Sequence, residues 1–210
     1  MSTMLNWWPY VGQVLLLAVL ITLIPGRFVN DSRLRIGVTA ALLALCLFLP
    51  VSGLSVAQWL RSVVGDLSIF TLLVFLNILS QRLIKRNFIT ADTRKKLLLG
   101  VAMVGVVFYP LALGVSSFDP YRLGYSPVFM AVLLCLASII AWLRAQRELA
   151  IILLLPLLAY NLEIFESPNL WDYLLDPLLL VYAVVQILAT FNLLSFGKKL
   201  AFGKVGAHYE

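Results

Sequence analysis

Residues 82–96 have the sequence RLIKRNFITADTRKK, in which six basic residues separate two long apolar runs. Outward from this stretch the chain continues as apolar runs of similar length, seven in all. Each is close to the roughly 20 residues that a helix needs to cross a bilayer. The sequence therefore predicts an all-α integral membrane protein, a polytopic bundle of about seven transmembrane helices. The runs cover about residues 7–25, 34–52, 67–84, 97–114, 127–144, 149–165 and 177–196.

The basic residues alternate between the gaps that separate these runs. Successive gaps hold three, one, six, one, two and no Lys or Arg residues, and three more follow the last run. Fourteen of the sixteen bases thus fall on one side, and only Arg61 and Arg122 fall on the other. Because short basic loops stay in the cytoplasm, this alternation predicts an N-terminus outside and a C-terminus inside the cell.

The composition leaves little room for a second domain. The chain is 62% hydrophobic, and its mean hydropathy is +0.98. We expect a single bundle over residues 1–196 and a short basic cytoplasmic tail over 197–210, with an uncleaved first run because no Lys or Arg precedes it. The net charge of +6 comes from bases beside the runs, so the lipid bilayer, and not nucleic acid, is the expected partner. The expected location is a bacterial inner (cytoplasmic) membrane.

Two short segments between the runs are amphipathic. In LSVAQWLRSVVGD, residues 54–66, the apolar residues share one helical face, and Ser55 with Gln58 forms a capping-box pattern. In ESPNLWDYLLDP, residues 166–177, Ser167 can cap a helix and Pro168 can take its first position. Both are too short to span, so we expect two interfacial helices on the outer face, about 55–65 and 168–175. They form a working platform there, or they simply cover the bundle's end.

Acidic residues gather on the predicted outer side, where bases are scarce. Arg61 and Arg122 either pair with these carboxylates or bind a lipid phosphate or an anionic glycan. Glu163, near the end of the run 149–165, is either a costly membrane-embedded carboxylate or an ordinary interfacial one. The candidate polar site on the outer face comprises Arg61, Asp66, Arg122, Asn161, Glu163, Glu166, Asp172 and Asp176.

Catalytic, metal-binding and cofactor-binding patterns are not found. The single histidine, His208, lies in the predicted tail, and the chain has no HExxH, P-loop or GxSxG sequence. Cys46 and Cys135 lie apart in apolar runs, which favours a role as small buried residues. We therefore predict no catalytic residue, no metal and no cofactor.

Three functions stay open. The first is a non-enzymatic accessory, scaffold or regulatory subunit of machinery that acts on envelope lipids or surface glycans, with a membrane protein as partner through the outer face. The second is a small transporter or lipid flippase, suggested by Glu163 and by Pro110 and Pro156 within apolar runs. The third is an intramembrane lipid-modifying enzyme that uses the outer carboxylates.

Overall fold

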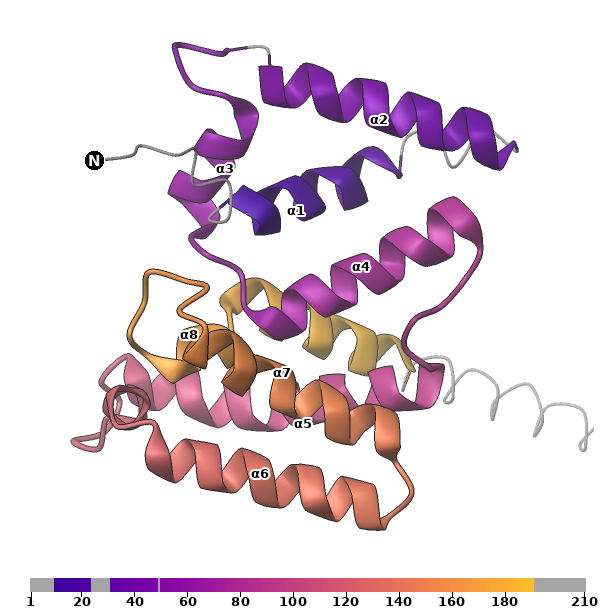
Figure 1. The fold of residues 1–210 in the computed structure, drawn as a ribbon. Coiled ribbons are helices and arrows are strands. Elements are labelled where there is room, and N and C mark those ends of the chain that lie inside the picture. The colour runs from indigo at the N-terminus through magenta and orange to yellow at the C-terminus, as the bar shows by residue number, and fades with distance from the viewer. Residues whose placement is uncertain (1–9, 24–30, 49, 191–210) are drawn as a thin grey trace, which may run out of the picture.

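The computed structural model describes residues 10–23, 31–48 and 50–190, and this part of the chain is helical without a named strand (Figure 1). A helix lies in each of the seven predicted runs, while the predicted tail 197–210 lies outside the described residues. The elements are α1 (Val11–Ile21), α2 (Ser32–Phe48), α3 (Val56–Val64), α4 (Ile69–Ile84), α5 (Ala91–Ala112), the 3₁₀ helix η3 (Pro120–Tyr125), α6 (Val128–Leu143), α7 (Arg147–Asn161), α8 (Leu170–Leu174) and a C-terminal helix, Pro177–Thr190.

The long helices run back and forth between two ends. In Figure 1, α3, α8 and the connection from α5 to α6 lie at one end, on the left of the view. The connections from α4 to α5 and from α6 to α7 lie at the opposite end. The first end carries most of the acidic residues and the second most of the bases, and we call them the acidic end and the basic end.

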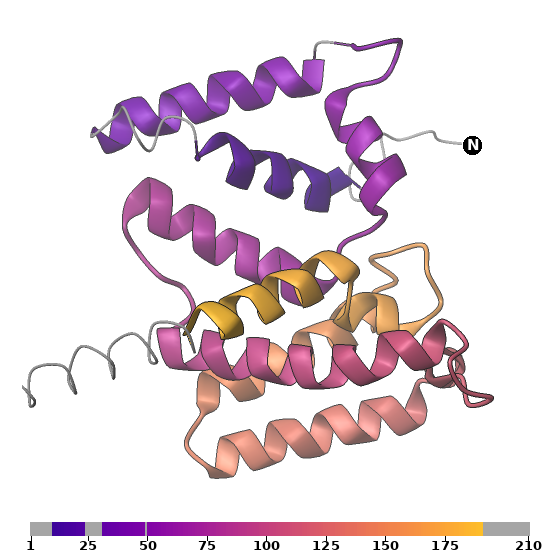
Figure 2. The ribbon, with the colours of Figure 1, turned by 180° about the vertical axis from the view of Figure 1, so that it is seen from behind.

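The centre of the bundle is α4, which contacts α1 and α2 on one side and α7 and α8 on the other. Val74 of α4 is completely buried in the larger apolar core, which α5, α7, α8 and the C-terminal helix complete. A second core joins α4 to α1 through residues such as Phe75 and Leu16. Figure 2 shows the C-terminal helix between α4 and α5, where Gly105 leaves room for the side chain of Leu180.

Arginine side chains hold helix C-termini together at the basic end. Arg82 Nη1 donates to the Val19 carbonyl and to the Thr22 hydroxyl, both at 3.0 Å, at the end of α1. Arg35 Nη1 donates to the carbonyl of Arg82 at 2.6 Å. A cation near the C-terminus of a helix interacts favourably with the helix dipole. These two bases therefore link α1, α2 and α4, in addition to the role that the sequence predicts for them in orienting the chain.

The basic loop is shorter than the sequence predicted. α5 begins at Ala91, not at residue 97, because the Thr90 side chain accepts a hydrogen bond from the Thr93 N–H and caps the helix. Residues 94–96 accordingly lie on the first turns of α5. The Thr90 N–H also donates to Glu148 Oε1 at 2.9 Å, which ties the start of α5 to the first turn of α7.

By length and composition, α5 alone among the described helices is long and apolar enough to cross a membrane. The described parts of α1, α4, α6 and the C-terminal helix are apolar but shorter. Pro110 and Pro156 lie inside α5 and α7, as predicted. The prediction that both cysteines are buried is wrong: Cys46 is only partly buried, and Cys135 is exposed on α6, because the face of α6 that carries it is turned away from the bundle.

Candidate functional site at the acidic end

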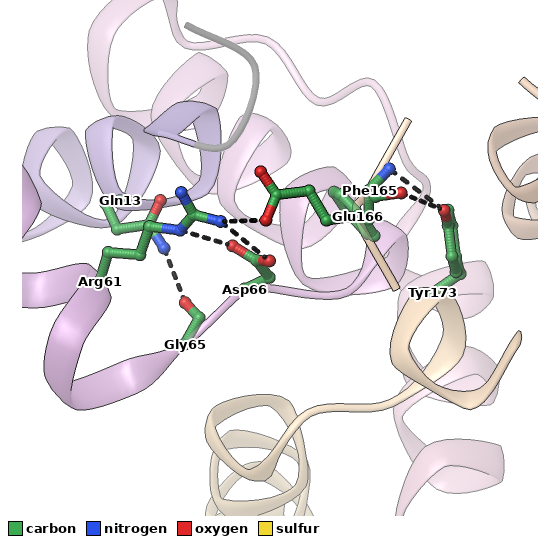
Figure 3. A network of polar contacts seen from close by, with 7 residues as sticks. All are labelled: Gln13, Arg61, Gly65, Asp66, Phe165, Glu166 and Tyr173. Carbon is green, nitrogen blue, oxygen red and sulfur yellow. Dashed lines mark hydrogen bonds and ion pairs between the residues drawn. The ribbon is translucent and has the colours of Figure 1, made fainter. Parts of the chain in front are cut away.

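The short helix α3 is fixed at both of its ends. The capping box predicted for it is confirmed, since the Ser55 hydroxyl accepts from the Gln58 N–H and the Gln58 side chain accepts from the Ser55 N–H. At the other end Gly65 has φ +73°, a conformation that favours glycine. The Gly65 carbonyl accepts a 2.7 Å hydrogen bond from the buried side chain of Gln13 on α1 (Figure 3).

Arg61 of α3 lies between two carboxylates (Figure 3). Its Nε donates to Asp66 Oδ1 at 3.0 Å, its Nη2 donates to Asp66 Oδ2 at 3.3 Å, and Nη2 lies 3.6 Å from Glu166 Oε2. The guanidinium also lies over the Tyr10 ring, 5.4 Å from its centroid. Of the two interpretations of Arg61, the structure contains the ion pair, and the charge of Asp66 is thereby neutralised.

The segment 166–177 packs against η3, from a distant part of the sequence. Asn169 is fully buried, and its Nδ2 donates to the Tyr121 carbonyl at 3.0 Å. The Trp171 indole N–H donates to the Pro120 carbonyl at 2.9 Å. Gly124 lies so close that a Cβ there would be 1.7 Å from Asn169 Oδ1. These contacts pack the connection between α5 and α6 against the segment 166–177.

The predicted start of the second interfacial helix is wrong. Asn169, not Ser167, is the N-cap, since its side chain accepts from the Trp171 N–H at 3.0 Å. Pro168 therefore precedes the helix, and α8 is only five residues long. Ser167 instead accepts from the Asn169 N–H and donates to Asp172. The sequence offered two capping residues side by side, and the tertiary contact between Asn169 and η3 selects the second.

Asp176 lies where two helices begin, and only 3% of it is exposed. Its Oδ2 accepts from the Ser68 N–H at 3.0 Å, from the Ser68 hydroxyl at 2.8 Å and from the Thr71 hydroxyl, at the start of α4. Its Oδ1 accepts from the Leu179 N–H at 2.8 Å, and so caps the C-terminal helix. Helix N-termini favour negative charge, so both helices stabilise this carboxylate. We call this arrangement the Asp176 junction.

Asp172 is bound differently, through hydroxyl groups. The Tyr121 hydroxyl lies 3.1 Å from both carboxylate oxygens, and the Ser167 hydroxyl donates to Oδ2. Burial, and next the negative charge of Asp172, raise the pKa of the Tyr121 phenol, which therefore stays protonated as a donor. Unlike Asp66, Asp172 has no ion pair within the described residues.

These groups meet at a cavity of about 450 Å³, which we call the acidic cavity. Its wall combines carboxylates and hydroxyls with the aromatic rings of Phe108 and Trp171, whose centroids are 4.3 Å apart. Three of the eight predicted site residues thus line one space. The polar lining residues are Asp66, Tyr109, Tyr121, Ser167, Asp172 and Asp176.

The other predicted residues lie elsewhere on the acidic end. Glu166 reaches the site only through its contact with Arg61, and Arg122 is exposed and forms no ion pair with the described residues. Asn161 donates to the Leu157 carbonyl of its own helix. Glu163 lies beyond the end of α7, exposed and in a left-handed conformation at φ +50°. Its position gives no support to a transport pathway through α7.

Sequence reasoning missed Tyr121, Ser167 as a partner of Asp172, and the pair Ser68 and Thr71. A signal existed for Ser68, because a serine directly before an apolar run is typical of a helix N-cap. No comparable local pattern exists for Tyr121, since its partner Asp172 is 51 positions away in the sequence.

No cluster of three or more potential metal ligands occurs within the described residues. The fold and site thus define an all-helical bundle with an acidic, aromatic cavity at one end. Comparison with known proteins adds no identity, because no family model, no curated protein and no solved structure matches this chain.

Proposed function

We propose that this protein is an integral membrane protein of a bacterial inner membrane, in which seven helices cross the bilayer. The acidic end lies outside, and the basic end lies in the cytoplasm. The observation that carries the proposal is the pattern of exposure, because the outward faces of α6 and of α5 beyond its first turns are apolar. Met103 and Val107 of α5 and Val128 and Leu143 of α6 are all more than half exposed. Exposed apolar surface of this extent is expected where lipid is the solvent.

Burial of polar groups supports the same proposal. Gln13 and Asn77 are essentially completely buried. Gln13 donates to the Gly65 carbonyl just after α3, and Asn77 accepts from the Phe88 N–H in the connection after α4. Ser138 of α6 likewise donates to the Ala150 carbonyl of α7 at 2.8 Å. Polar groups turned inward and apolar groups turned outward are typical of helices packed in a membrane.

The helix lengths have a consequence for the bilayer. The 16 residues of α4 extend about 24 Å, several ångströms less than the roughly 30 Å of hydrocarbon. Local thinning of the bilayer and flanking polar side chains that reach the interface accommodate such a difference.

Orientation can be tested by labelling engineered cysteines in cells, with Cys46 and Cys135 replaced by alanine. Ser117→Cys lies in the exposed connection after α5, and Asn87→Cys lies in the exposed connection before it. A membrane-impermeant maleimide should label Ser117→Cys in intact cells, and Asn87→Cys only after permeabilisation. Labelling of both from the same side would overturn the topology.

We further propose that the protein acts as a non-enzymatic accessory, scaffold or regulatory subunit of machinery for envelope lipids or surface glycans. The surface of α3 supports this role. Trp59 and Val63 are exposed there, on a helix that its capping box, Gln13 and Arg61 hold rigid. A rigid surface with exposed apolar side chains is suited to bind a protein partner, because little conformational entropy is lost on binding.

A photo-crosslinking residue at Val63 tests the role in the native host. The matched control is the same residue at Phe88, which is similarly exposed but lies at the basic end. We expect a distinct protein adduct from position 63 that position 88 does not form. Adducts to lipid alone, or identical patterns at both positions, would contradict a partner at the acidic end.

An enzyme that acts on a lipid head group is the second candidate, because the acidic cavity brings three carboxylates together. Asp172 is the carboxylate available for chemistry, since Asp66 is paired and Asp176 caps two helices. Incubation of the purified protein with lipids of its host should then give a product that Asp172→Asn does not form. If the wild type and Asp172→Asn gave identical lipid profiles, the enzyme hypothesis would be rejected and the accessory role would remain.

A further inference from the structure

A groove between α5 and α6 has a lining almost entirely of apolar side chains. Its volume is about 520 Å³, within the range of ligand-binding sites. Phe70, Val101 and Met130 are buried at its floor, whereas Phe129 and Leu133 on its rim are at least half exposed. The groove therefore opens to the outside of the bundle, and if the helices cross the membrane, as proposed above, it opens to lipid.

Gly100 leaves part of the groove empty. It lines the groove on α5, and a Cβ built on it meets no atom within 4 Å. At Gly105, on the same helix, a Cβ would lie 2.7 Å from Leu180. A larger residue at position 105 would displace the Leu180 side chain, whereas at position 100 glycine borders open space.

The groove extends from the basic end towards the acidic end. On α5 it is lined from Lys96 to Val104, which is about 12 Å along the helix, and on α6 it is lined from Phe129 to Ala137. Trp171 and Leu123 line the groove from α8 and η3, at the acidic end, and the Trp171 side chain is fixed by its bond to Pro120.

Among the described residues that line the groove, Lys96 alone is charged, and it lies on the side of the basic end. Its ammonium pairs with the exposed carboxylate of Asp92 at 2.5 Å, one turn away, and an ammonium has three donors. Arg144 directly follows α6 and Arg147 begins α7, so both also lie at the basic end. These bases therefore favour an anionic head group beside Lys96.

From these observations we infer that the α5–α6 groove binds one acyl chain of an anionic phospholipid from the cytoplasmic leaflet, with the phosphate beside Lys96. The inference rests on the proposed membrane location. It goes beyond the accessory role, because it assigns a lipid site to the face between α5 and α6, with the head group at the basic end.

Native mass spectrometry of the full chain, purified in mild detergent and titrated with phosphatidylglycerol or phosphatidylcholine, tests the inference. We expect one retained phosphatidylglycerol per chain. Gly100→Leu should fill the groove and lower this occupancy at least about fivefold, while favouring the helix. Gly37→Leu is the matched control, since Gly37 also lies in a helix with open space around its Cβ, on α2.

Two charge variants test the head group. Lys96→Gln should lower the preference for phosphatidylglycerol over phosphatidylcholine about fivefold, the factor that corresponds to the roughly 1 kcal/mol gained per base near an anionic leaflet. Asp92→Asn should raise that preference, because it removes the competing carboxylate. The lipid site would be overturned if Gly100→Leu retained as much phosphatidylglycerol as the wild type. It would also be overturned if all variants showed the same preference for phosphatidylglycerol over phosphatidylcholine.

The outcome can be separated from the membrane proposal itself. Release of the wild-type chain from membranes by alkaline carbonate would overturn the membrane location, and the lipid site with it. If the wild type stays in the membrane and Gly100→Leu retains as much lipid as the wild type, the groove inference alone is overturned. A crosslink from position 104 to a protein, and not to lipid, would also overturn it, since a partner helix would then occupy the groove.

Discussion

Asp172 and Asp176 belong to one short segment and line the same cavity, yet their surroundings differ in kind. Asp176 accepts two backbone N–H groups and two hydroxyls from the starts of two helices. Asp172 accepts two side-chain hydroxyls, one of them from Tyr121. Backbone donors cannot turn away without unwinding a helix, whereas hydroxyls can rotate towards water or a ligand. The comparison indicates that Asp176 stabilises the fold and that Asp172 is available to bind.

The largest effect is expected from Asp176→Ala. It leaves buried donors without a partner and removes a cap, so we expect a loss of about 3 kcal/mol in the free energy of unfolding. Thermal unfolding in detergent, followed by circular dichroism, measures this loss. Asp176→Asn should lose less, because asparagine is also a good N-cap. A loss below about 1 kcal/mol for the alanine variant would remove the distinction between the two aspartates.

Asp172→Ala should cost only about 1 kcal/mol, because it frees two hydroxyls beside a cavity and no backbone group. Tyr121→Phe should cost a similar amount. The double variant should cost less than the sum, since both changes break the same hydrogen bond. Additive losses in thermal unfolding would show that the two residues do not act as a pair.

How far the sequence predicts this molecule depends on the range of the interaction. The helices follow from apolar runs and local caps, as the Ser55–Gln58 box illustrates. The start of α8 does not, because Asn169 is selected as the cap through contacts with Tyr121 and Gly124, far away in the sequence.

The candidate site divides in the same way. Asp66 and Arg61 are close in sequence, and their ion pair was one of two interpretations that the residues allowed. The roles of Asp172 and Asp176 could not be separated, because the donors that distinguish them, the Tyr121 hydroxyl and the Ser68 backbone N–H, are 51 and 108 positions away. The positions of the two aspartates between apolar runs predict that both lie on the outer side. They do not indicate which carboxylate has all its hydrogen-bond partners within the fold.

The ion pair between Arg61 and Asp66 provides a partly exposed reference for the two aspartates. Each side chain is more than a quarter exposed, so solvent and salt screen the interaction. A double-mutant cycle with Arg61→Gln and Asp66→Asn should give a coupling free energy of about 0.2–1 kcal/mol. This coupling should fall at high salt, unlike the loss in Asp176→Ala. A salt-independent coupling of several kcal/mol would mean that Asp66 is as integral to the fold as Asp176.

The smallest effect is confined to alkaline pH and reports on the charge of Asp172. Because the folded protein raises the pKa of Tyr121, the folded state holds the phenolic proton more tightly than the unfolded chain does. This contribution to stability is complete below the usual tyrosine pKa of about 10 and is lost as the pH rises above it. In alkaline thermal unfolding, Tyr121→Phe should therefore lose stability less steeply with rising pH than the wild type.

Asp172→Asn should also lose stability less steeply with rising pH, since it removes the charge that opposes ionisation of the phenol. Burial of Tyr121 still contributes in this variant. If both variants kept the wild-type slope, Asp172 would not act on Tyr121 as a charge, and the difference in binding capacity between Asp172 and Asp176 would lose its electrostatic basis.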